Sequence, residues 1–338
     1  MSKSKNDYRP ETRLVHAGTL RSQFGEMSEA LFLTQGYIYP SAEDCEARFT
    51  GKVPGYVYSR YSNPTMSMFE QRMAALEGAE AARSTSTGMA AVTTALMGLV
   101  RKGDHIVAAK ALFGSCRWVI EDWLGRFGVT STLVDGDDLD QWKKAVTKNT
   151  KVFFMETPTN PTLQVYDIAA VAEIAHGAGA KLVVDNVFAT PLYQSPLKLG
   201  ADVVVYSATK HIDGQGRVLG GCILASEKII VDNYHQLLRQ TGPSLSPFNA
   251  WVLLKGLETL SVRVARETET AGIIANKLAG HDKRTRRVYP GRKDHAQAAT
   301  VAKQMTGGST LIALEIKGGK AGAFRFLNGL SLIGITNN

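Results

Sequence analysis

A lysine and two hydroxyl side chains follow a short apolar run in the segment DVVVYSATKHIDGQGRVLGG (202–221). Ser207, Thr209 and Lys210 leave the end of this run together, and a glycine-rich stretch comes after them. Hydroxyls can bind phosphate oxygens, and a desolvated lysine can become a neutral amine that forms an imine with a carbonyl group. Taken alone, the segment could also be a polar strand end with an exposed lysine.

A carboxylate ends a second apolar run, KLVVD (181–185). A carboxylate at such a place costs free energy unless a cation pairs with it. A protonated pyridine nitrogen is such a cation, and a ring held in that form keeps its capacity to accept electrons. Asp185 could therefore serve a pyridine ring, or it could cap a helix.

Two polar turns could supply further ligand groups. In STSTGMAAV (84–92) a turn opens directly into a helical pattern, so the N–H groups of Gly88 and Met89 and the helix dipole could bind phosphate. In ETPTNPT (156–162) prolines on both sides of Asn160 restrict the loop, so its amide could point at one ligand atom. Either segment alone is compatible with a purely structural turn.

From about residue 64 the chain alternates between helical and strand patterns. Asn63-Pro64 offers a cap and a first helical position, and Gly78 ends the apolar periodicity that follows. We predict a core-facing helix there and a second helix from Gly88. The apolar residues of the first helix are Met66, Phe69, Met73 and Leu76. The predicted strands are HIVAA (105–109), VTSTLV (129–134), KVFFME (151–156), KLVVD (181–185) and DVVVYS (202–207).

Continuous apolar strands separated by helices indicate an α/β fold with a mostly parallel sheet between helices. Ligands of such sheets lie at the carboxyl ends of the strands, where the four segments fall. An amine, a carboxylate, a phosphate turn and an amide at one edge are what a pyridoxal 5′-phosphate (PLP) site needs. We therefore predict PLP, bound covalently to Lys210.

The pattern along the whole chain predicts three parts. Residues 1–60 have little periodicity and are expected to form an extended arm. Residues 61–240 form the PLP-binding large domain. The pattern is helical from Ser246 to Gly280, and a strand-like STLIALEI follows, which indicates a smaller C-terminal domain over 241–338.

Composition restricts the remaining classes of function. The 338 residues carry a formal charge of +8, but the basic residues are scattered apart from one run at 283–287, which we interpret as solvated surface and not as a nucleic-acid site. The three cysteines have no metal-ligand spacing and favour a reducing, cytoplasmic compartment. The N-terminus has no signal-like apolar region, and the apolar runs are too short to cross a membrane.

In its motifs the chain resembles the trans-sulfuration (Cys/Met metabolism) family of PLP enzymes, which have the aspartate-aminotransferase-like fold, fold type I. The matching stretches run in the family's order from about Thr12 to the last residue. They are YSRYSNPT (58–65), STGMAA (86–91), ETPTNP (156–161), VDN-FATP (184–191) and YSATKHIDGQG (206–216).

The resemblance implies roles for individual residues. Lys210 holds the cofactor and shuttles protons, and Asp185 pairs with the pyridine nitrogen. Asn160 lies near the phenolic oxygen. Tyr58 and Arg60 reach across a dimer interface to the neighbour's phosphate, within a homotetramer built from two dimers. The groups implied for the phosphate of the same chain are Gly88, Met89, Ser207 and Thr209.

Two departures from the family pattern matter. The ring that stacks on the cofactor is usually Tyr, and here it is Phe113, which can stack but cannot transfer a proton. Proton transfer would then fall to Lys210, Tyr58 or water. Family members also continue into a segment whose Arg holds the substrate α-carboxylate, and no residue here matches it, so we expect a truncated C-terminal domain.

The closest resemblance is to the bacterial branch that converts O-succinyl-L-homoserine and sulfide to L-homocysteine and succinate by γ-replacement, in methionine biosynthesis. The alternatives within the family are a cystathionine γ-synthase or γ-lyase, or an enzyme that uses O-acetylhomoserine. An alternative of another class is a catalytically silent PLP-binding protein, since the carboxylate-binding segment is unmatched. No metal, nucleic acid or membrane is expected as a partner.

Overall fold

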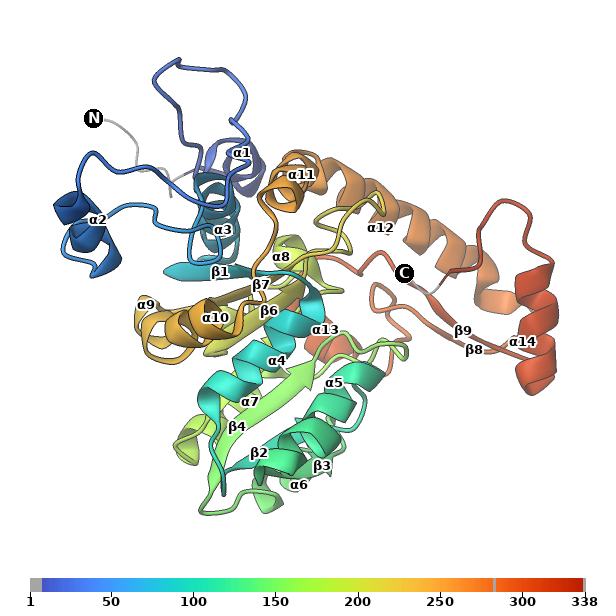
Figure 1. Ribbon diagram of the computed structural model, residues 1–338. Helices are drawn as coiled ribbons and strands as arrows, with labels where there is room; N and C mark the ends of the chain where they lie inside the picture. Colours follow the sequence, from blue (N-terminus) through green and yellow to red (C-terminus); the bar gives the residue numbers. More distant parts are fainter. Residues whose placement is uncertain (1–7, 282–283, 337–338) are drawn as a thin grey trace.

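The computed structural model describes residues 8–281 and 284–336. A seven-stranded sheet with the order β1-β7-β6-β5-β4-β2-β3 forms its centre (Figure 1). Strands β2 to β6 run parallel to one another, and β7 is antiparallel to both β6 and β1. The predicted mostly parallel sheet is therefore confirmed. The strands span Ala81–Thr85 (β1), His105–Ala109 (β2), Thr130–Val134 (β3), Thr150–Glu156 (β4), Lys181–Asp185 (β5), Val203–Ser207 (β6) and Gly221–Ala225 (β7).

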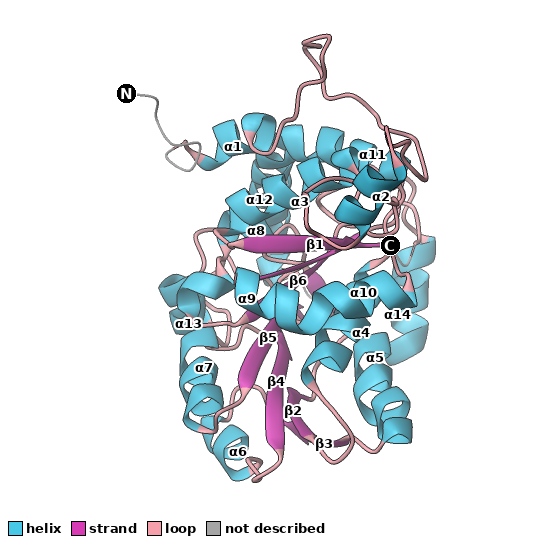
Figure 2. Ribbon diagram, turned by 60° about the vertical axis from the view of Figure 1, so that its left-hand side comes forward, coloured by secondary structure: helices cyan, strands magenta, loops and turns pink. Residues whose placement is uncertain are grey.

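Helices cover both faces of the sheet, which is why the middle residues of its central strands are apolar (Figure 2). Helix α4 (Gly88–Leu99) crosses one face, and α7 (Ile168–Gly177) packs against β4 and β5 on the other. The remaining helices of this region are α5 (Gly114–Trp118), α6 (Leu139–Lys144), α8 (Thr190–Tyr193), α9 (Glu227–Ile229) and α10 (Gln236–Thr241).

Helix α3 (Pro64–Glu77) begins and ends where the sequence predicts. The side chain of Asn63 accepts a hydrogen bond from the N–H of Thr65, and Gly78 ends the helix in the left-handed conformation, with φ 79°. Its four predicted apolar residues are all buried.

A buried polar network supports the strand ends near α3. The Tyr206 hydroxyl donates to Glu77 Oε2 (2.5 Å) and accepts from Asn186 Nδ2 (2.6 Å). Asn186 also bonds to Gln194, whose amide donates to the backbone oxygen of Thr157. The network therefore joins the residues beside the carboxyl ends of β4, β5 and β6.

The arm at 1–60 is less extended than predicted. Its described part contains α1 (Pro10–His16), which packs on α3, and α2 (Ala42–Phe49), which stands apart at the edge of the molecule (Figure 1). Both helices are short, so their helical periodicity is hard to separate from loop in the sequence. Between them the chain is irregular, and Phe24, Met27 and Ile38 are highly exposed.

After the sheet the chain forms two helices, α11 (Pro247–Glu258) and α12 (Leu260–Lys277), as the pattern from Ser246 predicts. A small antiparallel pair of strands, β8 (Arg284–Val288) and β9 (Ala313–Ile316), lies beyond them with α13 (Ala298–Gln304) and α14 (Gly319–Asn328). The predicted boundaries at 60 and 240 stay a prediction. Of the basic run, Lys283 lies outside the described residues.

Among the described residues, no helix combines the length and apolarity that a membrane crossing requires, and no group of His, Cys, Asp or Glu side chains could hold a metal ion.

Candidate active site

A cavity of about 250 Å³ lies at the carboxyl ends of the parallel strands, close to the lower limit of roughly 300 Å³ for small-molecule pockets. Eight of the ten residues that the sequence singled out line it. They are Gly88, Met89, Phe113, Asn160, Asp185, Ser207, Thr209 and Lys210. The sheet thus brings together five segments that are far apart in the chain.

The phosphate-binding turn is built by close approach of α4 to β6. The Thr87 side chain accepts a hydrogen bond from the N–H of Ala90, and Gly88 and Met89, whose N–H groups have no partner within the helix, line the cavity at the start of α4. A Cβ atom on Gly88 would lie 2.5 Å from the Ser207 Cβ, so only glycine allows this approach. Helix N–H groups beside two hydroxyls, Ser207 and Thr209, suit a phosphate.

Asp185 ends β5 and is 8% exposed. Its Oδ1 accepts a hydrogen bond from the N–H of Val187 (3.1 Å), and no cationic side chain among the described residues forms an ion pair with it. Burial raises the pKa of this carboxyl to about 7. A buried carboxyl without a cation fits a ligand that brings its own positive charge.

Lys210 lies in the turn after β6 and lines the same cavity. Burial lowers the pKa of its amine, because the charged form loses hydration. A larger share of the side chain is then the neutral amine that can attack an aldehyde.

Glu156 is a cavity residue that the sequence reasoning did not single out. It ends β4 in register with Asp185, it is 1% exposed, and burial beside that second carboxyl raises its pKa to about 8. The residue stood in the quoted ETPTNP motif, but a strand-terminal glutamate looks like solvated surface until its neighbours are known. Other cavity residues that were missed are Thr87, Val92, Cys116, Val187, Phe188 and Leu219.

Phe113 sits at the N-terminus of α5, lines the cavity and is 43% exposed. An accessible ring at this place can stack on a planar ligand. Asn160 lies in the loop after β4 and also lines the cavity. The predicted positions of both residues at the site are therefore compatible with their proposed contacts.

Tyr58 and Arg60 do not line this cavity. The Arg60 guanidinium lies 5.3 Å from the Tyr58 ring centre and 4.8 Å from that of Tyr61, and it donates a hydrogen bond to the backbone oxygen of Arg239. Their predicted role at a phosphate in a neighbouring chain stays a prediction.

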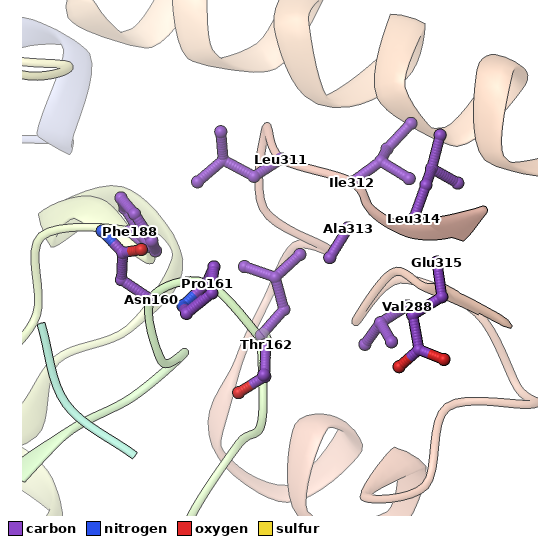
Figure 3. A pocket seen from close by; sticks show the side chains of 11 residues that line it. Asn160, Pro161, Thr162, Phe188, Val288, Leu311, Ile312, Ala313, Leu314 and Glu315 are labelled. Atoms are coloured by element: carbon purple, nitrogen blue, oxygen red, sulfur yellow. The ribbon is translucent and has the colours of Figure 1, made fainter. Parts of the chain in front are cut away.

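Two further hollows adjoin the cavity, and Asn160 and Phe188 line all three. One, of about 380 Å³, extends from Lys210 towards Gly214 and Glu267. The other, of about 430 Å³, lies between the loop of Asn160 to Leu163 and the segment that leads into β9 (Figure 3). A substrate joined to a cofactor at Lys210 has room on this side.

Comparison with known proteins adds to the geometry. The family model described as Cys/Met metabolism PLP-dependent enzyme matches residues 11–338. An O-succinylhomoserine sulfhydrylase from Mycobacterium tuberculosis is 51% identical over 328 residues, which cover 96% of this chain and 81% of the relative. One from Pseudomonas aeruginosa is 45% identical over 328 residues, with 97% and 81% covered.

Two solved structures of related proteins have the same fold as this chain. A MetB from Corynebacterium glutamicum superposes with a TM-score of 0.94 at 34% identity, over 98% of this chain and 85% of the other. A putative O-acetylhomoserine (thiol)-lyase, MetY, from Campylobacter jejuni gives a TM-score of 0.93 at 30% identity, over 98% and 91%. That structure contains a pyridoxyl-lysine 5′-monophosphate. The predicted fold class is confirmed.

Proposed function

The chain belongs to the family of Cys/Met metabolism PLP-dependent enzymes, and we propose that it acts as an O-succinylhomoserine sulfhydrylase. In this reaction sulfide forms a bond to Cγ of O-succinyl-L-homoserine and the bond from Cγ to the succinyl oxygen breaks. The products are L-homocysteine and succinate. The observation that carries the proposal is the buried, cation-free carboxyl of Asp185 in one cavity with Lys210 and the phosphate turn.

The residues of the cavity fit PLP. Asp185 would pair with the protonated ring nitrogen, and Lys210 would hold the aldehyde carbon. The phosphate would lie at the N-terminus of α4, near Ser207 and Thr209. The ring of bound PLP accepts the electron pair that remains when a proton leaves the substrate Cα.

Each of these side chains has a distinct task in the proposed reaction. The Lys210 amine, in its neutral form, would take the proton from the substrate Cα and could return one later. The Asp185 carboxylate keeps the proton at the ring nitrogen. Phe113 has no hydroxyl, so it stacks on the ring but moves no proton.

We further propose that two copies of the chain complete each site. Among the described residues that line the cavity, Lys210 is the one cation, and it is assigned to the aldehyde. The two charges of a phosphate would then lack a counter-ion within one chain. Arg60 of a neighbouring copy, with Tyr58, would supply it, which suits an oligomer; a tetramer and a cytoplasmic location remain parts of the proposal.

An assay of nucleophile choice tests the function. We expect the purified protein with PLP to release succinate and homocysteine from O-succinyl-L-homoserine and sulfide, and the Lys210→Ala variant to release neither. O-acetylhomoserine and cysteine serve as the competing substrate and nucleophile. Consumption of O-succinylhomoserine with cysteine but never with sulfide would refute the sulfhydrylase assignment.

A further inference from the structure

The two oxygens of the Glu156 carboxyl bond to two different loops of the active site. Oε2 accepts a hydrogen bond from the backbone N–H of Phe113 (2.8 Å), and Oε1 accepts one from the backbone N–H of Asn160 (2.6 Å). Phe113 follows β2 and Asn160 follows β4, so one side chain joins the loops that leave two neighbouring strands.

Both tethered residues present their own side chains to the cavity. Phe113 opens the five-residue helix α5, and no side chain caps that helix. Asn160 lies outside any helix or strand. A short helix and a loop hold their positions weakly by themselves, so a buried acceptor that fixes both backbones has a direct effect on where the ring and the amide lie.

We propose that Glu156 is a positioning residue for the reaction, holding the Phe113 ring and the Asn160 amide against the cofactor through their backbone N–H groups. This inference rests on the proposed function, because it assigns a cofactor to the cavity. It adds a residue that acts through two others without touching the reacting atoms.

Glutamate suits this positioning task better than glutamine or aspartate. A carboxylate can accept from two N–H groups at once, whereas the amide of glutamine has one acceptor oxygen and would turn an NH₂ group towards the second donor. Aspartate is one methylene shorter and cannot keep both bonds without a shift of β4. Burial and the Asp185 carboxyl in the adjacent strand raise the pKa of Glu156, and the two backbone N–H bonds act in the opposite direction, towards the charged form that accepts from both donors.

The test compares Glu156→Gln and Glu156→Ala with Glu77→Gln. Glu77 is a matched control, because it is equally buried, burial raises its pKa to about 8 as well, and it lies outside the cavity lining. In Glu77→Gln the glutamine oxygen can still accept from Tyr206. We measure PLP affinity, the visible circular dichroism of bound PLP, which reports ring orientation, the melting temperature, and kcat and KM.

We expect both Glu156 variants to bind PLP with altered visible circular dichroism and to lose about 10- to 100-fold in kcat, with a smaller change in KM, since a misplaced reacting group costs up to about 100-fold. Glu77→Gln should keep the wild-type dichroism and kcat. Glu156 variants with lower melting temperatures but wild-type dichroism and kcat would show that the residue is only structural, and would overturn the proposal.

A double-mutant cycle with Phe113→Ala covers the case in which Glu156→Ala does not fold. If Glu156 acts through the Phe113 ring, the losses in PLP dichroism from Glu156→Gln and Phe113→Ala should be clearly less than additive. Additive losses contradict the proposed route. Because cofactor binding and dichroism need no substrate, these measurements remain valid even if the wild-type protein fails to use sulfide, which is the outcome that rejects the proposed function.

Discussion

At the scale of single residues, burial shifts the pKa of Asp185 and of Lys210 in opposite directions for one reason. Loss of hydration favours the neutral form of each group, so the carboxyl pKa rises and the amine pKa falls. A cofactor that brings a protonated ring nitrogen and an aldehyde suits both groups. The nitrogen is a cation for the Asp185 carboxyl, and the aldehyde is an electrophile for the Lys210 amine.

The variant Asp185→Asn tests this pairing without changing the size of the side chain. We expect weaker PLP binding and a fall in kcat of at least about 100-fold, comparable to the removal of one preorganised electrostatic group in other enzymes. Steady-state kinetics and PLP titration measure the two effects. A near-normal kcat in Asp185→Asn would show that the assigned role is wrong.

At the scale of elements, the site depends on how closely α4 approaches β6. The variant Gly88→Ala places a Cβ 2.8 Å from the Ser207 backbone, so the helix or the strand must move. Overpacking of this kind costs about 1–3 kcal/mol, and we expect PLP to bind roughly tenfold or more weakly. Gly177→Ala in α7 is the control, because its Cβ would meet no atom within 4 Å. Equal PLP affinity in both variants would contradict a phosphate site at the start of α4.

The polar network under the strand ends gives a second prediction at this scale. The pKa of Glu77 is about 8 in the folded protein and 4.5 as its reference value, because burial favours the protonated form. Its contribution to stability is therefore complete below about pH 4.5 and is lost as the pH rises through 8. We expect Glu77→Gln to lose less stability than the wild-type protein between pH 5 and pH 8, by on the order of a few kcal/mol.

Melting temperatures of the wild-type protein and of Glu77→Gln, measured from pH 5 to pH 8, check this difference in stability. The same decline in both proteins would mean that the Glu77 carboxyl is not protonated in the folded state at neutral pH. Glu156 and Asp185 titrate in both proteins, so their contributions cancel in the difference.

The sequence predicted the elements that carry strong local signals. The five parallel strands and the caps of α3 could be predicted because long apolar runs and cap residues determine them. Strand β7 was missed because the glycine-rich stretch before it hides its start, and β1 because its Arg and Ser residues break the apolar run. Gly88, Asp185, Ser207 and Lys210 were found since each stands at the end of a predictable element.

Glu156 shows what sequence reasoning leaves out. Its proposed function depends on strand order, which places it beside Asp185, and on the path of the loop that brings Phe113 back to it. Neither fact is local in the chain. The proposed roles of Tyr58 and Arg60 are harder still to predict, because they depend on the placement of a second copy of the chain.

At the scale of the whole molecule, the central question is whether one active site needs two chains. Tyr58 and Arg60 lie outside the cavity of their own chain, and the arm that leads to them exposes Phe24, Met27 and Ile38. Burial of these apolar side chains against another protein surface would be favourable, which suits the proposed contact between two chains.

Complementation between two inactive variants tests this arrangement. Arg60→Ala would impair the site of the neighbouring chain, whereas Lys210→Ala would destroy the site of its own chain. In a mixed dimer one site carries both defects and the other carries neither. Random mixing of two variants that form symmetric dimers makes about half of the dimers mixed. One of the two sites in each mixed dimer is intact, so activity should return to about a quarter of the wild-type value.

Co-refolding or co-expression of the two variants, followed by the homocysteine assay, measures this recovery. The control pairs Lys210→Ala with Asp185→Ala, both of which damage the site of their own chain, so no mixed dimer contains an intact site. Recovery in the first pair but not in the second requires that Arg60 acts in the partner's site. If neither pair recovers while mixed dimers are present, Arg60 acts within its own chain, and the phosphate must then find its counter-ion there.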